Sequence, residues 1–288
     1  MGTLRPTRVG VLALGAVIAA AALLGNAVGA TVEAGGGRLA FLRGTINTSP
    51  CGAIYTMSPG GGAPRPFTAL RQPVCFPSWS PDGSKVAFNF VSGKTGIYTV
   101  HADGSHLQRV TAGGTDYHPT WSADGSALVF TRAFNLYEVK TAGGRARALT
   151  HITTPGVSAA APAWSPDGRH IAFQLAGSRA ALVVLDLGSG TLTPLGVGGS
   201  PSWSPDGKKI VFAAPGGLKI AGLDGRTVRT LVQGDGPSWS PDGRKIAYWW
   251  RTSGAGPRSA VYVVNVDGTG KQQVSTGPYD ATPTWLPH

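Results

Sequence analysis

Short apolar runs separated by polar, glycine-containing turns fill the chain from residue 38 onward, and one pattern recurs among them. It reads Pro-Ser-Trp-Ser-Pro-Asp-Gly-Arg-Lys-Ile-Ala-Tyr at Pro237–Tyr248, and its other copies are Pro77–Phe88, Pro119–Phe130, Pro162–Phe173, Pro201–Phe212 and the partial Pro283–Trp285. The tryptophans of these copies lie 42, 43, 39, 36 and 46 residues apart. A period of roughly 40 residues is typical of solenoids, arrays and propellers.

Each repeat predicts four short antiparallel strands. The Ser-Pro-Asp-Gly segment is a turn, because proline presets φ, aspartate bonds nearby amides and glycine accepts positive φ. A third and a fourth run follow it, such as Ile97–Val100 and Arg109–Thr111. Strands such as Lys209–Phe212 are apolar on both faces, as a sheet packed between two neighbours requires. Four such strands that cannot bury their faces alone are typical of a propeller blade.

The repeats also predict how a ring would close. In each complete repeat, a tryptophan segment marks the first strand and the second strand follows it. The earliest second strand, Arg38–Phe41, has no tryptophan segment before it, and the last tryptophan segment, Pro283–Trp285, has no second strand after it. Pairing of Pro283–Leu286 with Leu39–Leu42 would complete the first blade and remove two free sheet edges. We therefore predict an all-β fold over residues 31–288. We expect a six-bladed β-propeller with four antiparallel strands per blade, in which a C-terminal strand completes the first blade.

Residues 1–30 differ in kind from the repeats. Arg5 and Arg8 precede the uncharged run Val9–Leu24, and small residues follow it. This run is shorter than the roughly 20 residues that a membrane-spanning helix needs. We predict a cleaved signal peptide rather than a retained anchor. The protein would then be periplasmic, in the cell envelope or secreted, with no membrane span after cleavage.

Export bears on the two cysteines. Cys51 falls in the predicted connection between the second and third strands of the first blade, and Cys75 falls just before the first strand of the next. Both connections emerge on the same face of an up-and-down propeller. We predict a Cys51–Cys75 disulfide, which suits an oxidising compartment. Two free buried thiols are the alternative.

Charge narrows the range of partners. The chain carries 25 basic and 14 acidic side chains, for a net charge of +11, which falls to +9 once Arg5 and Arg8 leave with the signal peptide. The basic residues are spread over both predicted faces, whereas a nucleic-acid groove needs a concentrated basic stripe. We expect no nucleic-acid binding. A positive surface favours acidic envelope polymers or anionic headgroups, or it simply maintains solubility.

The repeated Pro-x-Trp-Ser-Pro-Asp-Gly-x-x-Ile-Ala-Phe unit resembles the TolB-type, WD40-like PD40 repeat over residues 38–288. The resemblance implies an exported propeller that serves mainly as a binding platform, and it implies that the Pro-Asp-Gly turns are structural. Ala123 replaces the turn proline in one copy, which removes only the preset φ. TolB carries an additional α/β domain before its propeller, and we expect none here, which argues against a Tol-Pal-like role.

Recognisable catalytic and metal-binding motifs do not occur in this sequence. The chain lacks the Gly-x-Ser-x-Gly of serine peptidases with the α/β-hydrolase fold. Its six histidines show no His-Glu-x-x-His spacing, and its Asp-x-Gly runs lack the spaced carboxylates of an EF-hand loop. We expect no metal and no cofactor.

The segments before each Pro-x-Trp converge where the first strands begin, at the mouth of the predicted central channel. These segments and the neighbouring loops supply the candidate ligand-binding residues, namely Arg71, Asp116, Tyr117, His118, Asp235, Trp250, Arg251, Tyr279 and Asp280. Tyrosine, tryptophan and arginine give low-entropy contact area and charge pairing. Each could instead be a solvated loop side chain.

Three functions compete for this mouth. The preferred hypothesis is a non-catalytic, monomeric binding module for a protein or an acidic polymer of the cell envelope. The second is a polysaccharide lyase or hydrolase that uses Asp116, His118 and Asp280 as acid and base. The third is a purely structural envelope protein.

Overall fold

In the computed structural model of the 288 residues, Gly35–His288 form one compact unit. The structure describes residues 37–44, 51–67, 70, 72–90, 95–225, 227–251, 258–277 and 279–286, all of which belong to this unit. The predicted signal peptide and Arg71 lie outside the described residues. Within them, no helical segment has the length and apolar character needed to cross a bilayer.

The described residues form an all-β fold. The strands are β1 (Leu39–Arg43), β2 (Cys51–Met57), β3 (Arg65–Pro66), β4 (Val74–Trp79), β5 (Lys85–Phe90), β6 (Ile97–His101), β7 (Gln108–Arg109), β8 (Tyr117–Trp121), β9 (Ala127–Arg132), β10 (Asn135–Lys140), β11 (Arg147–Ala148), β12 (Ser158–Trp164), β13 (His170–Ala176), β14 (Ala181–Asp186), β15 (Leu192–Val197), β16 (Gly199–Trp203), β17 (Lys209–Ala214), β18 (Gly217–Gly222), β19 (Thr227–Thr230), β20 (Asp235–Trp239), β21 (Lys245–Arg251), β22 (Ser259–Asn265), β23 (Gln272–Gln273) and β24 (Asp280–Trp285).

Four sheets have four antiparallel strands each, β8–β11, β12–β15, β16–β19 and β20–β23. The remaining strands form one eight-stranded sheet in the order β24-β1-β2-β4-β5-β6-β7, with β3 paired to β2. Only two residue pairs, Cys51↔Cys75 and Gly52↔Val74, join β2 to β4. The last strand, β24, pairs antiparallel with β1, with Leu39 opposite Trp285 and Arg43 opposite Asp280.

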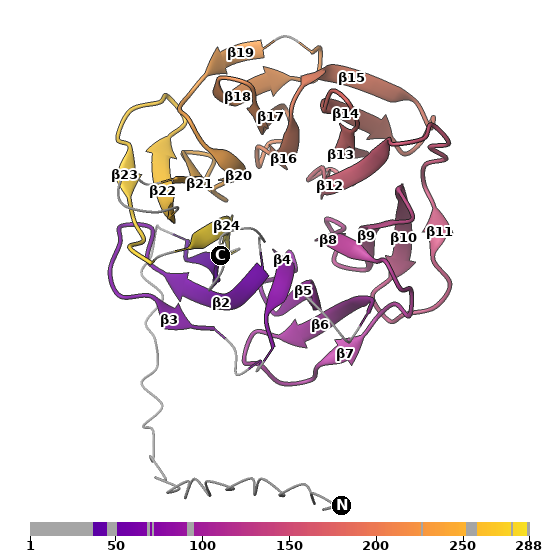
Figure 1. Cartoon of the computed structure of the whole chain (residues 1–288), viewed down its shortest axis with the longest axis horizontal. Coiled ribbons are helices and arrows are strands. Elements are labelled where there is room, and N and C mark those ends of the chain that lie inside the picture. The colour runs from indigo at the N-terminus through magenta and orange to yellow at the C-terminus, as the bar shows by residue number, and fades with distance from the viewer. Residues whose placement is uncertain are drawn as a thin grey trace, which may run out of the picture. The chain divides into compact units, whose positions relative to one another are not determined.

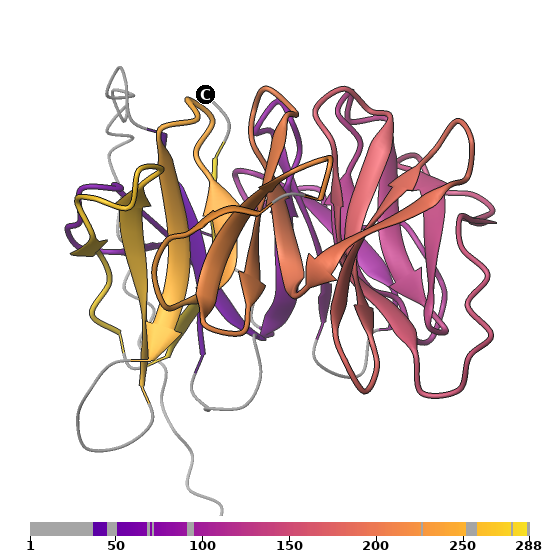
Figure 2. The same ribbon diagram turned by 90° about the horizontal axis from the view of Figure 1, so that it is seen from above.

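The sheets stand around a common axis, with β24, β4, β8, β12, β16 and β20 nearest to it (Figure 1). The strands run between two ends that carry the connections (Figure 2). We call the end where the innermost strands begin the mouth face, and the end with the Ser-x-Asp-Gly connections the turn face. Because the strands are antiparallel, the connections from the second to the third strand of each sheet also lie at the mouth face.

Apolar side chains of neighbouring sheets pack together. The second strand of each repeat contributes one large aromatic ring that is fully or almost fully buried, namely Phe41, Phe88, Phe130, Phe173, Phe212 and Tyr248. One cluster joins Ala87 and Ile97 to Trp121 and Phe130 of the next sheet. Apolar residues on both strand faces are therefore needed, because each sheet is covered by a neighbour on each side.

The repeated turn has the geometry that its sequence predicts. In the first copy, the Ser80 hydroxyl donates to Asp82 and accepts the Lys85 amide, Asp82 accepts the Ser84 amide, and Gly83 has a φ of 67°. The hydrogen bond from Ser80 is the main cause that lowers the pKa of Asp82 to about 2. The copy with Ala123 in place of proline keeps the same turn hydrogen bond as the first, between the glycine amide and the serine carbonyl. These aspartates are turn formers.

Three of the six repeat tryptophans bridge adjacent sheets, whereas Trp164 donates to Gly168 in its own turn. Indole Nε1 of Trp121 donates to the carbonyl of Ser78 in the preceding sheet at 2.9 Å, and Trp285 donates to the Ser238 carbonyl at 3.0 Å. Trp203 makes the same bond to Ala163 at 2.9 Å. In these three copies the indole combines burial of a large apolar ring with a directed inter-sheet hydrogen bond.

The predicted disulfide is confirmed. Cys51 opens β2 and Cys75 lies in β4, directly opposite it in register, and their sulfur atoms are bonded with the Cα atoms 4.2 Å apart. The bridge reinforces the junction at which only two residue pairs join β2 to β4. The cysteines lie on paired strands rather than in loops, which adds to the rigidity of the link.

Candidate functional site

A ring of unusual backbone conformations surrounds the axis. The residue before the proline of each Pro-x-Trp has a φ between 46° and 56°, and these residues are Phe76, His118, Ala161, Ser200, Gly236 and Thr282. The register of each innermost strand shifts at or within one residue of this point, as between Cys75 and Ser78 in β4. A residue before proline normally adopts an extended conformation, and a left-handed one costs a residue with a side chain roughly 1 kcal/mol or more.

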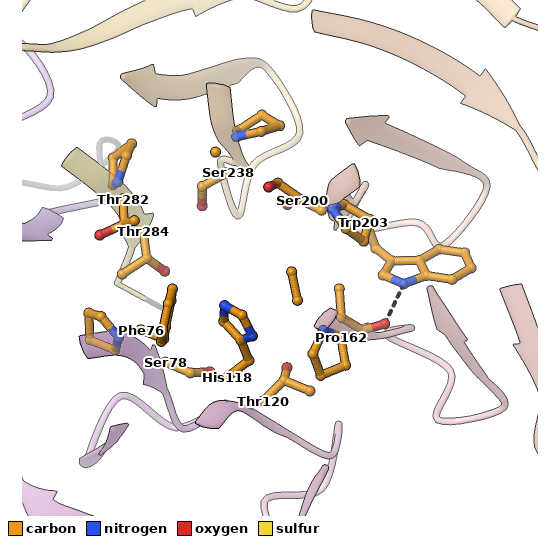
Figure 3. Close-up of a pocket in the computed structure, with 18 of the residues that line it drawn as sticks. Phe76, Ser78, His118, Thr120, Pro162, Ser200, Trp203, Ser238, Thr282 and Thr284 are labelled. Carbon is orange, nitrogen blue, oxygen red and sulfur yellow. Dashed lines mark hydrogen bonds between the residues drawn. The ribbon is translucent and has the colours of Figure 1, made fainter. Parts of the chain in front are cut away.

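These bulges direct side chains toward the axis, as bulges near binding sites commonly do. Phe76, His118, Ser200 and Thr284 surround one opening in Figure 3. The opening is a cavity of about 540 Å³, and seven prolines and six residues of the x position contribute to its wall. This axial channel has the volume of a small-ligand or peptide side-chain site.

Hydroxyl groups and aromatic rings dominate the channel wall. The x positions supply Ser78, Thr120, Ala163, Ser202, Ser238 and Thr284. The rings come from Phe76, Trp164, Trp203 and Trp249. Among the described residues, the wall includes one aspartate and one histidine but no lysine or arginine. The channel is therefore suited to neutral or cationic groups rather than to anions.

His118 is the basic group of the channel. Its ring centroid lies 3.7 Å from that of Phe76 and 4.9 Å from that of Tyr117. Burial lowers the pKa of His118 from 6.5 to about 4, so the imidazole is neutral at pH 7. Its Nδ1 atom is buried and has no hydrogen-bond partner among the described residues. A neutral imidazole with an unsatisfied nitrogen can accept or donate one hydrogen bond, depending on its tautomer.

Asp235 is the acidic group of the channel, at the start of β20. Its carboxylate accepts the Gly236 amide at 2.6 Å. Burial is the main cause that raises the pKa of Asp235, and hydrogen bonds to Gly236 and Ser200 oppose it. Trp249 lies opposite Asp235 in the β20–β21 register and also lines the channel. A Cβ atom on Gly236 would approach the Trp249 Nε1 atom to 2.7 Å, so the absent side chain makes room for the indole.

Two other candidate carboxylates are engaged by arginines. Arg132 donates to both oxygens of Asp116 at 2.6 and 2.7 Å, and Thr111 also donates to Asp116. Arg43 likewise donates to both carboxylate oxygens of Asp280, at 2.7 and 2.8 Å. Neither carboxylate side chain has any exposed surface. These charges are satisfied within the protein, and we assign them to holding the innermost strand on the second strand of its sheet.

The remaining candidates are spread around the mouth face. Tyr117 is half-buried beside His118, and burial raises the pKa of its phenol. Tyr279 is half-buried and forms an isolated bridge with Ser259, while Arg251 is exposed at the end of β21. Trp250 packs against the cluster around Tyr248 and does not line the channel.

Sequence reasoning missed Trp249 and Phe76. Both line the channel, whereas the sequence prediction named the neighbouring Trp250 as the ligand-binding residue. Strand alternation gives the missing signal, because Trp249 and Trp250 must point to opposite faces of β21. Phe76 could be found from its position before Pro77, which it shares with His118.

The radial sheets and the axial channel define this molecule as a β-propeller. A family model described as the TolB β-propeller domain, PD40, matches residues 132–288. The chain belongs to this family.

Individual relatives agree with this assignment. A TolB homologue of Chlorobium luteolum is 30% identical over 149 residues, a match that takes in 50% of this chain and 34% of the relative. A protein described as an uncharacterized peptidase of Bacillus subtilis is 34% identical over 135 residues, which take in 41% of this chain and 18% of that protein. The chain thus matches about a third or less of these curated relatives.

Among solved structures, TolB of Acinetobacter baumannii superimposes with a TM-score of 0.72 at 21% identity. The superposition covers 88% of this chain and 67% of that one. This likeness establishes the shared fold.

Proposed function

We propose that this chain is an exported, monomeric propeller whose axial channel binds a segment of a protein partner without catalysing a reaction. The observation that carries the proposal is the ring of left-handed residues around the channel. Five of the six have side chains and therefore bear backbone strain. Strain that recurs at one site and aims side chains into a cavity supports a binding role there.

The channel requires a closed ring, and we infer six blades with β24 completing the first. The pairing of β24 with β1 supports closure, as does a cluster that joins Leu39 and Phe41 to Val261 and Val263. The eight-stranded sheet counts as two blades, because only two residue pairs and the disulfide join its halves.

A protein segment suits the channel better than an acidic polymer does. The wall offers hydroxyls, prolines and aromatic rings, which hydrogen-bond and pack against peptide groups. A polyanion would meet the Asp235 side chain and would find no lysine or arginine among the described wall residues. We infer that a cationic or neutral side chain of the partner enters near Asp235.

The lyase or hydrolase hypothesis is less well supported. Its acid and base candidates, Asp116 and Asp280, are fully covered and held by Arg132 and Arg43. A general acid or base must reach the proton that it transfers. His118 makes ring contacts with Phe76 and Tyr117 rather than a contact with a carboxylate that could orient it.

Export is supported by the pattern of residues 1–30 and by the disulfide, which suits an oxidising compartment. The partner would then lie in the same compartment. The family's exported members make an envelope protein the first class to test.

The test is copurification of tagged protein from cells that export it. Thr120→Trp places an indole in the channel, and Thr193→Trp places the same group on the exposed outer strand β15 as a matched control. We expect a protein that copurifies with the wild type and the control to be lost from Thr120→Trp, with unchanged denaturation midpoints. Equal recovery from Thr120→Trp would refute channel binding, and the absence of any specific partner would favour the purely structural role.

A further inference from the structure

An exposed aromatic residue stands on the mouth face away from the channel. Phe134 occupies the turn between β9 and β10, and 63% of its surface is exposed, the largest fraction among the exposed large apolar side chains of the described residues. Exposure of most of a phenylalanine side chain costs free energy that a polar residue would avoid. The turn that carries it is therefore of interest.

The backbone of this turn is strained. Ala133 and Phe134 have φ values of 44° and 73°, and Arg132 pairs with Asn135 across them. Two-residue turns with positive φ at both positions normally use Asn-Gly or Gly-Gly. The corresponding turn between β17 and β18 uses Pro215 and Gly216 instead. Among the described connections from a second to a third strand, only this one has positive φ at residues other than glycine.

Hydrogen bonds hold this turn rigidly. The Phe134 carbonyl accepts the Ala159 amide of the neighbouring sheet at 2.8 Å. The Asn135 side chain accepts the Ile152 amide at 2.6 Å and the Thr150 hydroxyl at 2.9 Å. The ring of Phe134 is consequently presented from a fixed base rather than from a flexible loop.

Acidic side chains are unevenly divided between the two faces, whereas basic side chains occur on both, since Lys85, Lys209 and Lys245 also lie beside turns of the turn face. Nine acidic residues lie in or beside connections of the turn face, namely Asp82, Asp103, Asp124, Asp167, Asp186, Asp206, Asp224, Asp242 and Asp267. On the mouth face, Asp116 and Asp280 are neutralised by arginines, and Asp235 lies in the channel. Arg179, Arg251 and Arg258 are exposed there. Among the described residues, the rim of the mouth face is therefore cationic.

The basic and apolar groups are distributed around the ring. Arg179 lies in the β13–β14 connection, while Arg251 and Arg258 flank the connection from β21 to β22, on another side of the axis (Figure 1). Val197, which is 47% exposed, lines a hollow with Arg179 but is not part of a continuous apolar patch with Phe134. A protein hot spot is usually a contiguous, desolvated cluster. Separate apolar side chains and arginines spread around one face instead suit an extended anionic surface.

We propose that the mouth face docks on an anionic lipid surface. Phe134 inserts at headgroup depth, and Arg179, Arg251 and Arg258 pair with lipid phosphates. Amphipathic docking of this kind combines a small apolar insertion with electrostatic attraction, and it is reversible and sensitive to salt. The proposal does not depend on binding in the channel, because none of these four residues lines it.

The experiment is flotation with vesicles of phosphatidylcholine alone or with about a third phosphatidylglycerol, at low and high salt. The test variants are Phe134→Ser, Arg179→Glu and the turn replacement Ala133→Asn with Phe134→Gly. Matched controls on the turn-face side are Leu107→Ser, at a residue 44% exposed, and Lys209→Glu. Phosphatidylcholine vesicles distinguish electrostatic attraction from nonspecific adsorption to lipid.

We expect binding to the phosphatidylglycerol vesicles only, weakened by salt and by about fivefold or more for each mouth-face arginine lost. Phe134→Ser should also weaken binding, while Leu107→Ser and Lys209→Glu should bind as the wild type does. The Asn-Gly turn replacement should raise the denaturation midpoint and still weaken binding, because it removes strain together with the ring.

Failure of the wild type to float with anionic vesicles would overturn the proposal, as would equal effects of the mouth-face and turn-face variants. If vesicle binding is absent but Phe134→Ser reduces recovery of a copurified protein, the surface is a protein interface and lipid docking is wrong. If Phe134→Ser floats as well as the wild type and soluble polyglutamate displaces both, a general polyanion site replaces the lipid proposal.

Discussion

The bidentate pair between Arg132 and Asp116 allows an internal exchange experiment. The equivalent position of the preceding repeat holds Val74 opposite Phe90, an apolar pair in the same register. We consider three variants, Asp116→Val, Arg132→Phe and the double replacement that copies the neighbouring pair. The comparison measures whether the ion pair adds to the free energy of unfolding more than an apolar pair at the same position would.

The magnitudes follow from burial. The Asp116 side chain has no exposed surface, whereas Arg132 retains 28% of its exposure. Arg132→Phe leaves a buried carboxylate without its cation and should cost about 3–5 kcal/mol. Asp116→Val leaves an arginine that can turn toward water, so its cost should be smaller, about 2 kcal/mol. The double variant should lie within about 1 kcal/mol of the wild type, because an apolar pair of similar volume can replace a buried ion pair.

The assay is reversible urea unfolding at pH 7, followed by circular dichroism with the disulfide kept oxidised. The four proteins form a double-mutant cycle, and its coupling energy should exceed about 2 kcal/mol. If the double variant loses as much free energy of unfolding as the two single variants together, the two positions act independently. That result would refute the view that one structural position accepts either pair.

Three further predictions concern stability. The folded pKa of His118, about 4 against 6.5, means that unfolding takes up a proton between these values. The free energy of unfolding should therefore rise by about 3 kcal/mol from pH 4 to pH 7, and His118→Phe should abolish this part of the pH profile. Replacing both cysteines, as Cys51→Ser with Cys75→Ser, removes a link across 24 residues and should lower the free energy of unfolding by about 3 kcal/mol. A reductant should cause the same loss in the wild type and none in this variant. Ala161→Gly should raise the free energy of unfolding by about 1 kcal/mol in the same urea assay, because it relieves a φ of 47°, and a decrease would contradict strain there.

The repeat made most of the strand order predictable. Tryptophan spacing and the Ser-Pro-Asp-Gly turn mark where the first and second strands meet, because both have local physical causes. The cysteine pair was also predictable, since the topology places its two segments side by side. These features depend on short-range chemistry that is repeated five or six times.

The channel wall was harder to predict. The rule for residues before proline favours extended backbone, so the sequence does not announce that His118 and Phe76 are left-handed. Asp116 was predicted to bind a ligand because its ion-pair partner, Arg132, lies across a hairpin, 16 residues away in the sequence, and local patterns do not reveal the pair. Comparison of the repeats could have revealed the pair, since an aspartate and an arginine recur together at Asp280 and Arg43.

The most direct test of channel binding uses a photoreactive amino acid at Thr120 or Thr284, inside the channel, and at Thr193 on the outer strand as control. The exported protein is irradiated in its own compartment, and the adducts are identified by mass spectrometry. We predict that both channel positions yield the same protein, joined through one short segment, and that Thr193 does not. Adducts of that protein at Thr193 but at neither channel position would contradict the account.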